Sequence, residues 1–241
     1  MLIERVAARP ATPRVRAMTF RLSAALAPLA LLATTALAPA PLLARTPVAL
    51  NATVSAADPR AAQAGQEILR KGGSATDAAI AMMLTLGVVE PHNSGIGGGG
   101  FLMHHDGDTG LLESIDGRET APAAARPDRF LGPDGKPLPF VQAWPGGYSV
   151  GVPGNLRLAW DAHRKWGNLP WADLFQPAIK LAEDGYDLGE RTATALDRLK
   201  DIWKDFPEIQ SYFWVDGAPP PVGTLLKNPP LAALYKRIAA E

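Results

Sequence analysis

An arginine flanked by acidic residues is the group in this chain best suited to binding a small anion. The segment Asp116-Gly117-Arg118-Glu119 follows a strand-like run, so it stands where a hairpin is expected to leave a sheet. A guanidinium is planar, stays charged at any working pH and presents a fork of N–H donors that matches a carboxylate. Arg118 is therefore a candidate carboxylate anchor. The alternative, which these residues taken alone favour, is a surface ion pair with Glu119 or Asp116.

A run of glycines precedes the same strand-like region. Residues 95–100 read Gly-Ile-Gly-Gly-Gly-Gly and match the G-x-G-x-x-G pattern of dinucleotide sites. Such a site needs a strand before the glycines and a helix after them, so that the pyrophosphate meets the helix N-terminus. Here the order is reversed, so the match is accidental and no cofactor is expected. The run must instead serve close backbone packing, repeated positive φ angles or the lining of a substrate site, and physics alone leaves these open.

The other chemistry-bearing residues form no self-sufficient catalytic set. Cysteine is absent and so is the G-x-S-x-G pattern, which excludes thiolate nucleophiles and the nucleophile elbow of serine hydrolases. No metal site is expected, because His104 and His105 alternate along a strand and point to opposite faces. His163 is expected to be solvated on a helix, and His92 to cap or line the glycine run. The aromatic residues expected to serve packing are Trp144, Tyr148, Trp160, Trp166 and Trp171.

The elements that position these residues follow from periodicity and from Gly and Pro breaks. An N-cap at Asp58 with Pro59 predicts a helix to about residue 71, and Ser74 begins a second helix that is apolar almost all round and therefore buried. Strands are predicted at 52–57, 101–105, 111–115 and 148–152, and further helices at about 155–166, 171–184, 190–204 and 229–240, with 126–147 irregular. Strands come first and helices later, which favours an α+β arrangement.

The first 45 residues differ from the rest in charge. The chain is neutral overall, with 24 basic and 24 acidic residues, but residues 1–45 carry six arginines against one glutamate, leaving a net charge of −5 on the remainder. An uncharged run, Leu22–Ala44, follows the arginines and is typical of a secretory signal cleaved between residues 38 and 45. A retained membrane anchor is the alternative, which three prolines disfavour; Met18 is an alternative start.

Four stretches of residues 51–241 resemble the large subunit of γ-glutamyltranspeptidases (glutathione hydrolases). They are KGGSATDAAIAMMLTLGVVEPHNSGIGGGGF, DGRETAP, SVGVPGN and WGNLPWADLFQPAIKLAEDGY. The resemblance implies an N-terminal-nucleophile hydrolase fold, two stacked sheets between helical layers (αββα). It also implies a precursor that cleaves itself into two subunits and exposes a threonine as nucleophile. By this resemblance Arg118 corresponds to the arginine that binds the α-carboxylate of the glutamyl group, and the glycine run is mainly packed structure.

The resemblance predicts an incomplete enzyme. Residues 46–241 correspond to the N-terminal portion of the large subunit, and the family's nucleophilic threonine lies in the small subunit, outside this chain. We therefore expect an exported protein, periplasmic in a Gram-negative source, whose partners are a γ-glutamyl compound and the small subunit. A nucleic-acid or stable membrane partner is not expected. Two alternatives remain: a cephalosporin or glutaryl acylase fragment, and a non-catalytic exported binding protein.

Overall fold

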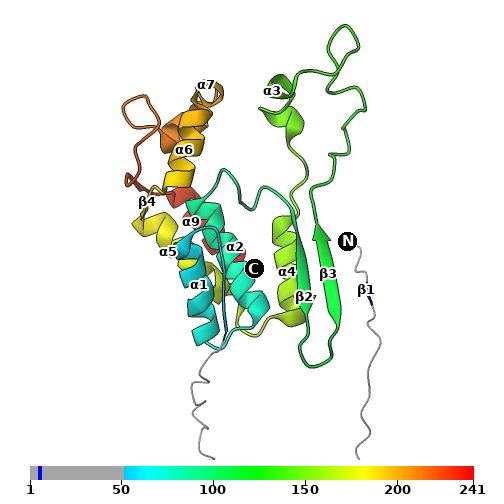
Figure 1. The fold of residues 1–241 in the computed structure, drawn as a ribbon, viewed down its shortest axis with the longest axis vertical. Helices are drawn as coiled ribbons and strands as arrows, with labels where there is room; N and C mark the ends of the chain where they lie inside the picture. The colour runs from blue at the N-terminus through cyan, green and yellow to red at the C-terminus, as the bar shows by residue number, and fades with distance from the viewer. Residues whose placement is uncertain (1–4, 7–51) are drawn as a thin grey trace, which may run out of the picture.

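The computed structural model describes residues 5–6 and 52–241. The predicted signal segment therefore lies outside the described residues, except for β1 (Arg5–Val6), which pairs antiparallel with β3 (Leu112–Gly117). No helix among the described residues is long and apolar enough to cross a membrane. The chain forms a helical body on one side and a sheet covered by a single helix on the other (Figure 1).

The helical body is built around two helices whose ends are fixed by side-chain caps. Helix α1 (Pro59–Arg70) begins at Asp58, whose carboxylate accepts a hydrogen bond from the backbone N–H of Arg60 at 2.8 Å. Helix α2 (Ala75–Val89) begins with a reciprocal capping box between Ser74 and Asp77. Both helices confirm the sequence prediction, and α2 is buried over most of its length, as its uniformly apolar composition requires.

The C-terminal helices close the core around α2. Helix α5 (Gln176–Asp184) follows the 3₁₀ helix η2 (Trp171–Phe175), and both pack with α9 (Pro229–Ala239) against α2. Tyr235 is fully buried there and its hydroxyl donates to the carbonyl of Leu84 at 3.2 Å. Burial raises the pKa of the Tyr235 hydroxyl, so this group remains a neutral donor. This hydrogen bond links α9 to α2 through two residues that are 151 positions apart in sequence.

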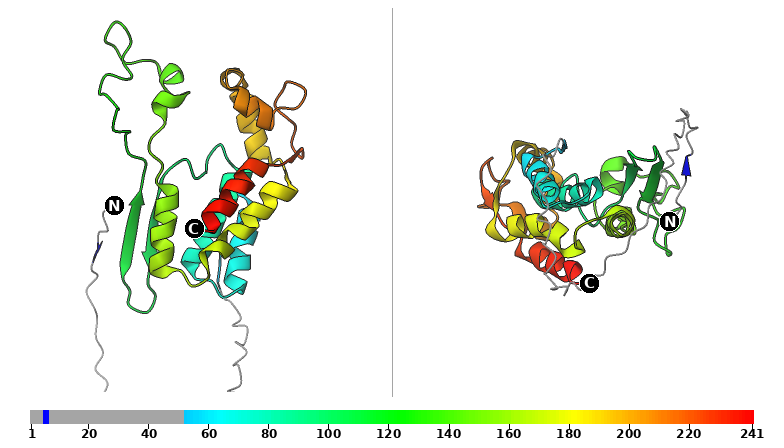
Figure 2. Two further views of the ribbon diagram at one scale, coloured as in Figure 1. Left: turned by 180° about the vertical axis from the view of Figure 1, so that it is seen from behind. Right: turned by 90° about the horizontal axis from the view of Figure 1, so that it is seen from below.

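The sheet consists mainly of one hairpin. Strand β2 (Gly100–His105) pairs antiparallel with β3, and Leu102 lies opposite Ile115. Helix α4 (Asn155–Trp166) covers one face, where Ile115, Leu158 and Ala162 form a small core. The opposite face points away from the helices (Figure 2), and the side chains of Phe101 and Met103 are each 68% exposed on β2. One sheet face is therefore covered by helix and the other is open.

The remaining elements lie at the ends of these two parts. Helices α6 (Glu190–Arg198), α7 (Lys200–Trp203) and α8 (Pro207–Phe213) extend from the helical body, beside the short pair β4 (Tyr186–Asp187) and β5 (Leu225–Leu226). Between β3 and α4 the chain makes an excursion that contains α3 (Phe140–Ala143) and the 3₁₀ helix η1 (Gly147–Ser149). We call residues 121–151 the projecting segment (Figure 1).

The α+β prediction is confirmed, but several local predictions were wrong. Residues 52–57 form no strand, because no neighbouring strand pairs with them, and the run predicted as a strand at 148–152 is mostly a 3₁₀ turn with one isolated bridge from Val152 to Thr120. The helix predicted at 190–204 is broken at Leu199. The irregular stretch 126–147 contains α3, and α8 was not predicted at all. A β-prone run becomes a strand only where a hydrogen-bonding edge lies beside it.

Candidate functional site

The backbone around Arg118 is held by close approaches at the end of β3. A Cβ atom on Gly117 would lie 2.5 Å from the Cβ of Leu158, and one on Gly154 would lie 2.0 Å from the Gly117 carbonyl oxygen. The backbone N–H of Arg118 donates to the carboxylate of Asp116 at 2.9 Å. Two glycines thus allow α4 to touch the strand, and Asp116 fixes the turn that follows. The position of Arg118 is set by this packing.

The side chain of Arg118 forms an ion pair with its neighbour. Its Nη1 lies 2.6 Å from Oε2 of Glu119, and the two side chains are 55% and 27% exposed. This is one of the two ion pairs that the residues alone favoured, whereas Asp116 accepts from the backbone instead. Glu119 Oε2 is buried and has no well-aligned hydrogen bond. In the described part of the chain Glu119 is the only charged partner of Arg118, so most N–H donors of the guanidinium face solvent.

The glycine run is divided between packing and lining. No residue from 95 to 100 has a positive φ, so the run does not serve to provide repeated positive φ angles. A Cβ atom on Gly99 would lie 2.5 Å from the Gly117 carbonyl oxygen and 2.6 Å from the Glu119 nitrogen, whereas none would meet anything within 4 Å at Gly95 or Gly97. The prediction of packed structure therefore holds for Gly99 and fails for Gly95 and Gly97, which border open space.

The N-terminus of α4 anchors this run. The backbone N–H groups of Gly154 and Asn155 donate to the carbonyl of Gly98 at 3.0 and 3.1 Å, and the side-chain amide of Asn155 donates to the Gly95 carbonyl at 2.7 Å. These bonds satisfy helix donors that would otherwise lack partners. They also hold the glycine run beside Arg118 and Glu119, at the open end of the hairpin where Gly100 lies opposite Gly117.

Arg118 and Glu119 contribute to the lining of three hollows, and two of them contain the residues discussed below. The first, about 500 Å³, is lined by the glycine run, Ser94 and Asn155, and we call it the glycine hollow. The second, about 570 Å³, is lined by the projecting segment, and we call it the basic hollow. Its charged lining residues are Arg118, Arg126 and Arg129 against the single acid Glu119. A small molecule bound at Arg118 therefore has space beside it in either of these two hollows.

One prediction about the histidines is confirmed and two are wrong. His104 and His105 do point to opposite faces of β2. His163 is not solvated: its side chain is only 14% exposed, and its Nε2 lies 2.8 Å from the Leu169 carbonyl oxygen and near buried Asp77. Helix periodicity placed His163 on the polar face because the loop that covers it was not visible in the sequence.

His92 lies beside the C-terminus of α2, and the side-chain amide nitrogen of Asn93 donates to its Nε2 at 2.8 Å. Burial lowers the pKa of His92, and the nearby charges of Arg191 and Arg198 add to this against the opposing effect of Glu90. Its Nδ1 is buried without a partner, and His92 is not among the residues that line the glycine hollow. The expectation that His92 caps or lines the glycine run is therefore wrong, because its ring pairs with Asn93 instead.

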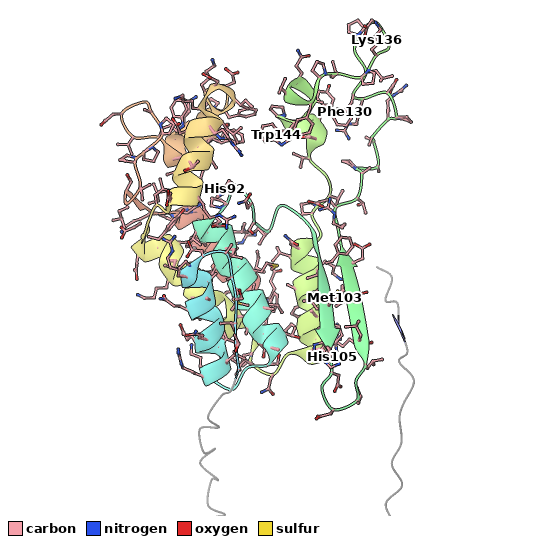
Figure 3. All side chains as sticks on the ribbon, viewed as in Figure 1. His92, Met103, His105, Phe130, Lys136 and Trp144 are labelled. Carbon is pink, nitrogen blue, oxygen red and sulfur yellow. The ribbon has the colours of Figure 1, made fainter. Side chains whose placement is uncertain are left out.

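The aromatic residues mostly serve packing, as predicted. Trp171 makes edge contacts with Trp160 and Phe175, and Trp166 stacks on His104 at 4.3 Å between ring centroids. Tyr148 is the exception, because it is 71% exposed and lines the basic hollow. Figure 3 shows Phe130 and Trp144 on the projecting segment above the sheet, with His92 at the facing end of the helical body.

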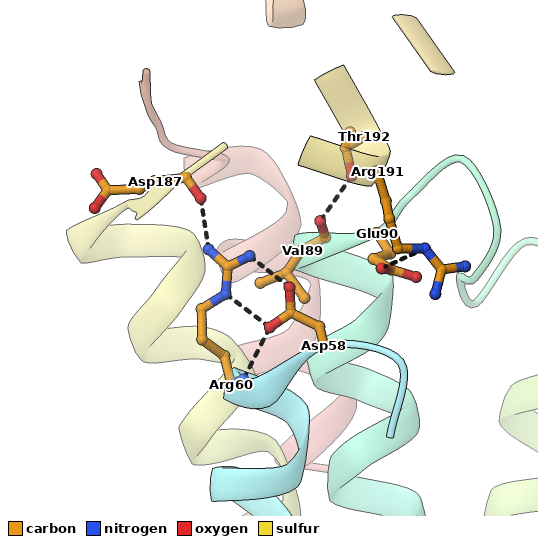
Figure 4. A network of polar contacts seen from close by, with 7 residues as sticks. All are labelled: Asp58, Arg60, Val89, Glu90, Asp187, Arg191 and Thr192. Atoms are coloured by element: carbon orange, nitrogen blue, oxygen red, sulfur yellow. Dashed lines mark hydrogen bonds and ion pairs between the residues drawn. The ribbon is translucent and has the colours of Figure 1, made fainter. Parts of the chain in front are cut away.

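A polar network where α1 begins and α2 ends was missed by sequence reasoning (Figure 4). Arg60 binds the Asp58 carboxylate through Nε at 2.8 Å and donates to the Asp187 carbonyl at 2.6 Å, while Arg191 lies 3.4 Å from buried Glu90. Burial alone raises the pKa of Asp58, but hydrogen bonds and charge from Arg60 outweigh it and lower that pKa. The cap signal at Asp58 was visible in the sequence, but the contact of Arg60 with Asp187, 127 residues away, was not.

Comparison with known proteins identifies relatives over most of the chain. The family model described as "Gamma-glutamyltranspeptidase" matches residues 61–241. The glutathione hydrolase proenzyme of Bacillus subtilis strain 168 is 40% identical over 188 residues, which are 78% of this chain and 32% of that protein. The chain therefore spans about a third of the length of this curated relative.

Solved structures share the fold. Helicobacter pylori γ-glutamyltranspeptidase superposes with a TM-score of 0.74 and 32% sequence identity, covering 78% of this chain and 54% of that chain. Cephalosporin acylase from Bacillus halodurans gives a TM-score of 0.63 and 31% identity, covering 75% of this chain and 34% of that chain. The second match is weaker in both measures, although both proteins share the arrangement of helices and hairpin described above.

Proposed function

Because the chain belongs to the γ-glutamyltranspeptidase family, we propose that it supplies the glutamyl-holding part of an enzyme that cleaves γ-glutamyl amides. The fold is of the N-terminal-nucleophile hydrolase type, as in the related structures. The complete enzyme would transfer the γ-glutamyl group of glutathione-like compounds to water, amino acids or peptides. The observation that carries the proposal is the exposed guanidinium of Arg118 between two hollows, positioned by packed backbone.

In this proposal Arg118 binds the α-carboxylate of the glutamyl group. The Nη1 edge of the guanidinium is held by Glu119, which leaves its other N–H donors to bind a carboxylate in the bidentate geometry that suits this pair. Glu119 carries the opposite charge and limits where the guanidinium lies. Arg118 and Glu119 thus bind and orient the substrate and perform no bond-breaking step.

The nucleophile would come from outside this chain. The family's nucleophile is a threonine whose own α-amine acts as general base, and such an amine must be free. Thr120 lies next to the site, in the lining of the basic hollow, but its nitrogen is part of the peptide bond to Glu119. We propose that the small subunit supplies the threonine and the charge stabilisation of the transition state.

The same subunit would cover the open sheet face. An αββα architecture stacks a second sheet on the first, and the outer face of β2 presents Phe101 and Met103 to solvent. Burial of this face in the complete enzyme would complete the core between the two sheets. An exported location is proposed from the Arg-rich start and apolar run of residues 1–45.

The test is binding of L-glutamate to the purified chain by isothermal titration calorimetry. We expect binding that is weakened at least about tenfold in Arg118→Gln, because a charge-assisted bidentate contact is lost. The matched control is Arg164→Gln, which removes an exposed arginine from α4. Equal affinities for wild type and Arg118→Gln would contradict the proposed role of Arg118.

The acylase alternative is favoured by one observation, the structural match to cephalosporin acylase. Glutarate keeps both carboxylates of glutamate but lacks its α-amino group, so it distinguishes the two functions by whether that amino group is recognised. Preference for glutarate over L-glutamate would support an acylase. Preference for L-glutamate supports the γ-glutamyl function, which the intact DGRETAP segment favours. The third alternative, a non-catalytic binding protein, predicts a stable monomer that binds glutamate tightly without a partner subunit.

A further inference from the structure

The basic hollow contains two arginines that the proposed function does not use. Arg126 and Arg129 line it from the projecting segment, and neither is in the lining of the glycine hollow. Glu119 is the only acidic residue in the lining. A hollow of about 570 Å³ with three guanidinium groups and one carboxylate carries a positive field into which an anion is drawn.

Arg129 is the better placed of the two arginines. Its guanidinium lies over the rings of Phe130 and Tyr148, 5.3 and 5.7 Å from their centroids, and the residue is half-buried. Within residues 52–241 it has no ion-pair partner. Stacking on two rings restricts the side chain and leaves the N–H groups at the edge of the guanidinium plane available for an acceptor.

Arg126 supports the same site from the rim. Its Nε lies 3.2 Å from the Asp128 carboxylate, and the two side chains are 79% and 58% exposed. An ion pair this exposed contributes little to stability, so Arg126 can readily exchange the Asp128 carboxylate for that of a ligand. The backbone N–H of Arg129 donates to the Arg126 carbonyl at 3.2 Å, which keeps both side chains on one turn.

We propose that Arg129, assisted by Arg126, binds a second carboxylate on the leaving-group side of the γ-glutamyl substrate. This inference rests on the proposed function, because it requires the glutamyl α-carboxylate at Arg118, which also lines the basic hollow. The preferred substrates are γ-glutamyl compounds whose amine portion is itself an acid, such as γ-glutamyl amino acids and peptides of glutamate.

The experiment compares two ligands on the full 241-residue chain by isothermal titration calorimetry. L-γ-Glutamyl-L-glutamate carries carboxylates on its amine portion, whereas L-glutamine has the same γ-amide without them. We expect the dipeptide to bind more tightly, and Arg129→Gln to weaken dipeptide binding about two- to fivefold while leaving L-glutamine unchanged. Arg126→Gln should have a smaller effect in the same direction. Arg164→Gln is the charge-matched control and should change neither affinity.

The outcomes separate this inference from the proposed function. Loss of binding of both ligands in Arg118→Gln, with equal dipeptide affinity in wild type and Arg129→Gln, overturns the second carboxylate site and leaves the role of Arg118 intact. No preference of the wild-type chain for the dipeptide also overturns it. A preference that declines as the salt concentration rises and disappears in Arg129→Gln supports it. Circular dichroism of each variant verifies that the fold is retained.

Discussion

Nη1 of Arg118 lies 2.6 Å from Oε2 of Glu119, and that oxygen is buried without a well-aligned hydrogen bond. The carboxylate is also confined from behind, because a Cβ atom on Gly99 would approach Oε2 to 2.7 Å. The Glu119 carboxylate therefore lies between the backbone of the glycine run and the Arg118 guanidinium, and it holds the guanidinium in place. We infer that Glu119 is a positioning residue for the proposed carboxylate anchor.

Replacing Glu119 with Gln should weaken glutamate binding without unfolding the protein. The amide preserves the shape of the side chain but loses the charge that restrains Arg118, so we expect affinity to fall about two- to tenfold. Stability should change by less than about 1 kcal/mol, because the pair is partly exposed. Calorimetric titration and urea unfolding measure the two effects, and unchanged affinity would contradict the positioning role.

Alanine substitutions within the glycine run should have unequal costs. At Gly99 the added Cβ meets the Gly117 carbonyl oxygen and the Glu119 nitrogen at 2.5 and 2.6 Å, and both are backbone atoms that yield little. We expect Gly99→Ala to destabilise the fold by roughly 1–3 kcal/mol, as overpacking does. Gly97→Ala is the matched control, because nothing lies within 4 Å of its Cβ position. Equal unfolding midpoints in urea would show that Gly99 is not packed as described.

Removing the Asp77 carboxylate should be among the most destabilising single changes. Asp77 is fully buried, and its Oδ2 accepts from the backbone N–H groups of Ser74, Asn168 and Leu169 at 2.9, 2.8 and 3.1 Å. Asp77→Ala leaves these donors without a partner, at a cost of roughly 3 kcal/mol or more. Ser74→Ala removes only the other half of the capping box and should cost about 1 kcal/mol. Thermal unfolding measures the stability of the two variants. Equal losses of stability would refute the role of Asp77 in linking the start of α2 to the loop at residues 168–169.

The ion pair between Asp58 and Arg60 should contribute stability that acid removes. The folded-state pKa of Asp58 lies below its ordinary value of 3.8, because the contacts with Arg60 outweigh burial. Its stabilising contribution is therefore complete above the unfolded-state pKa and is lost as the pH falls through the lower, folded-state pKa.

Asp58→Asn is the sharpest probe of that ion pair, because asparagine still caps the helix but carries no charge. We expect it to be less stable than wild type by on the order of 1 kcal/mol at pH 7. The difference should shrink toward zero as the pH falls below about 3.8. Urea unfolding across this range measures it, and a difference that is constant with pH would disprove the linkage.

The open sheet face should control self-association of the chain. Replacing Phe101 and Met103 with Thr removes two side chains that are each 68% exposed, so stability should change by less than about 1 kcal/mol. Sedimentation velocity should show less association in this double variant, since an apolar strand face recruits other chains. Leu102→Thr, on the covered face, should instead destabilise the fold by roughly 1–3 kcal/mol. Undiminished association of the double variant would exclude this face as its cause.

Local signals in the sequence determined the helices, the hairpin and the candidate anchor. The Asp58 and Ser74 caps, the apolar length of α2 and the alternation of β2 act within one or two turns or strands, so periodicity and cap chemistry predicted them. The tertiary structure decided what depends on segments distant in sequence. It brought the glycine run beside Arg118 and Asn155, buried His163 and divided that run into packed Gly99 and open Gly97. These outcomes depend on contacts between segments that are distant in sequence, so a local sequence pattern does not predict them.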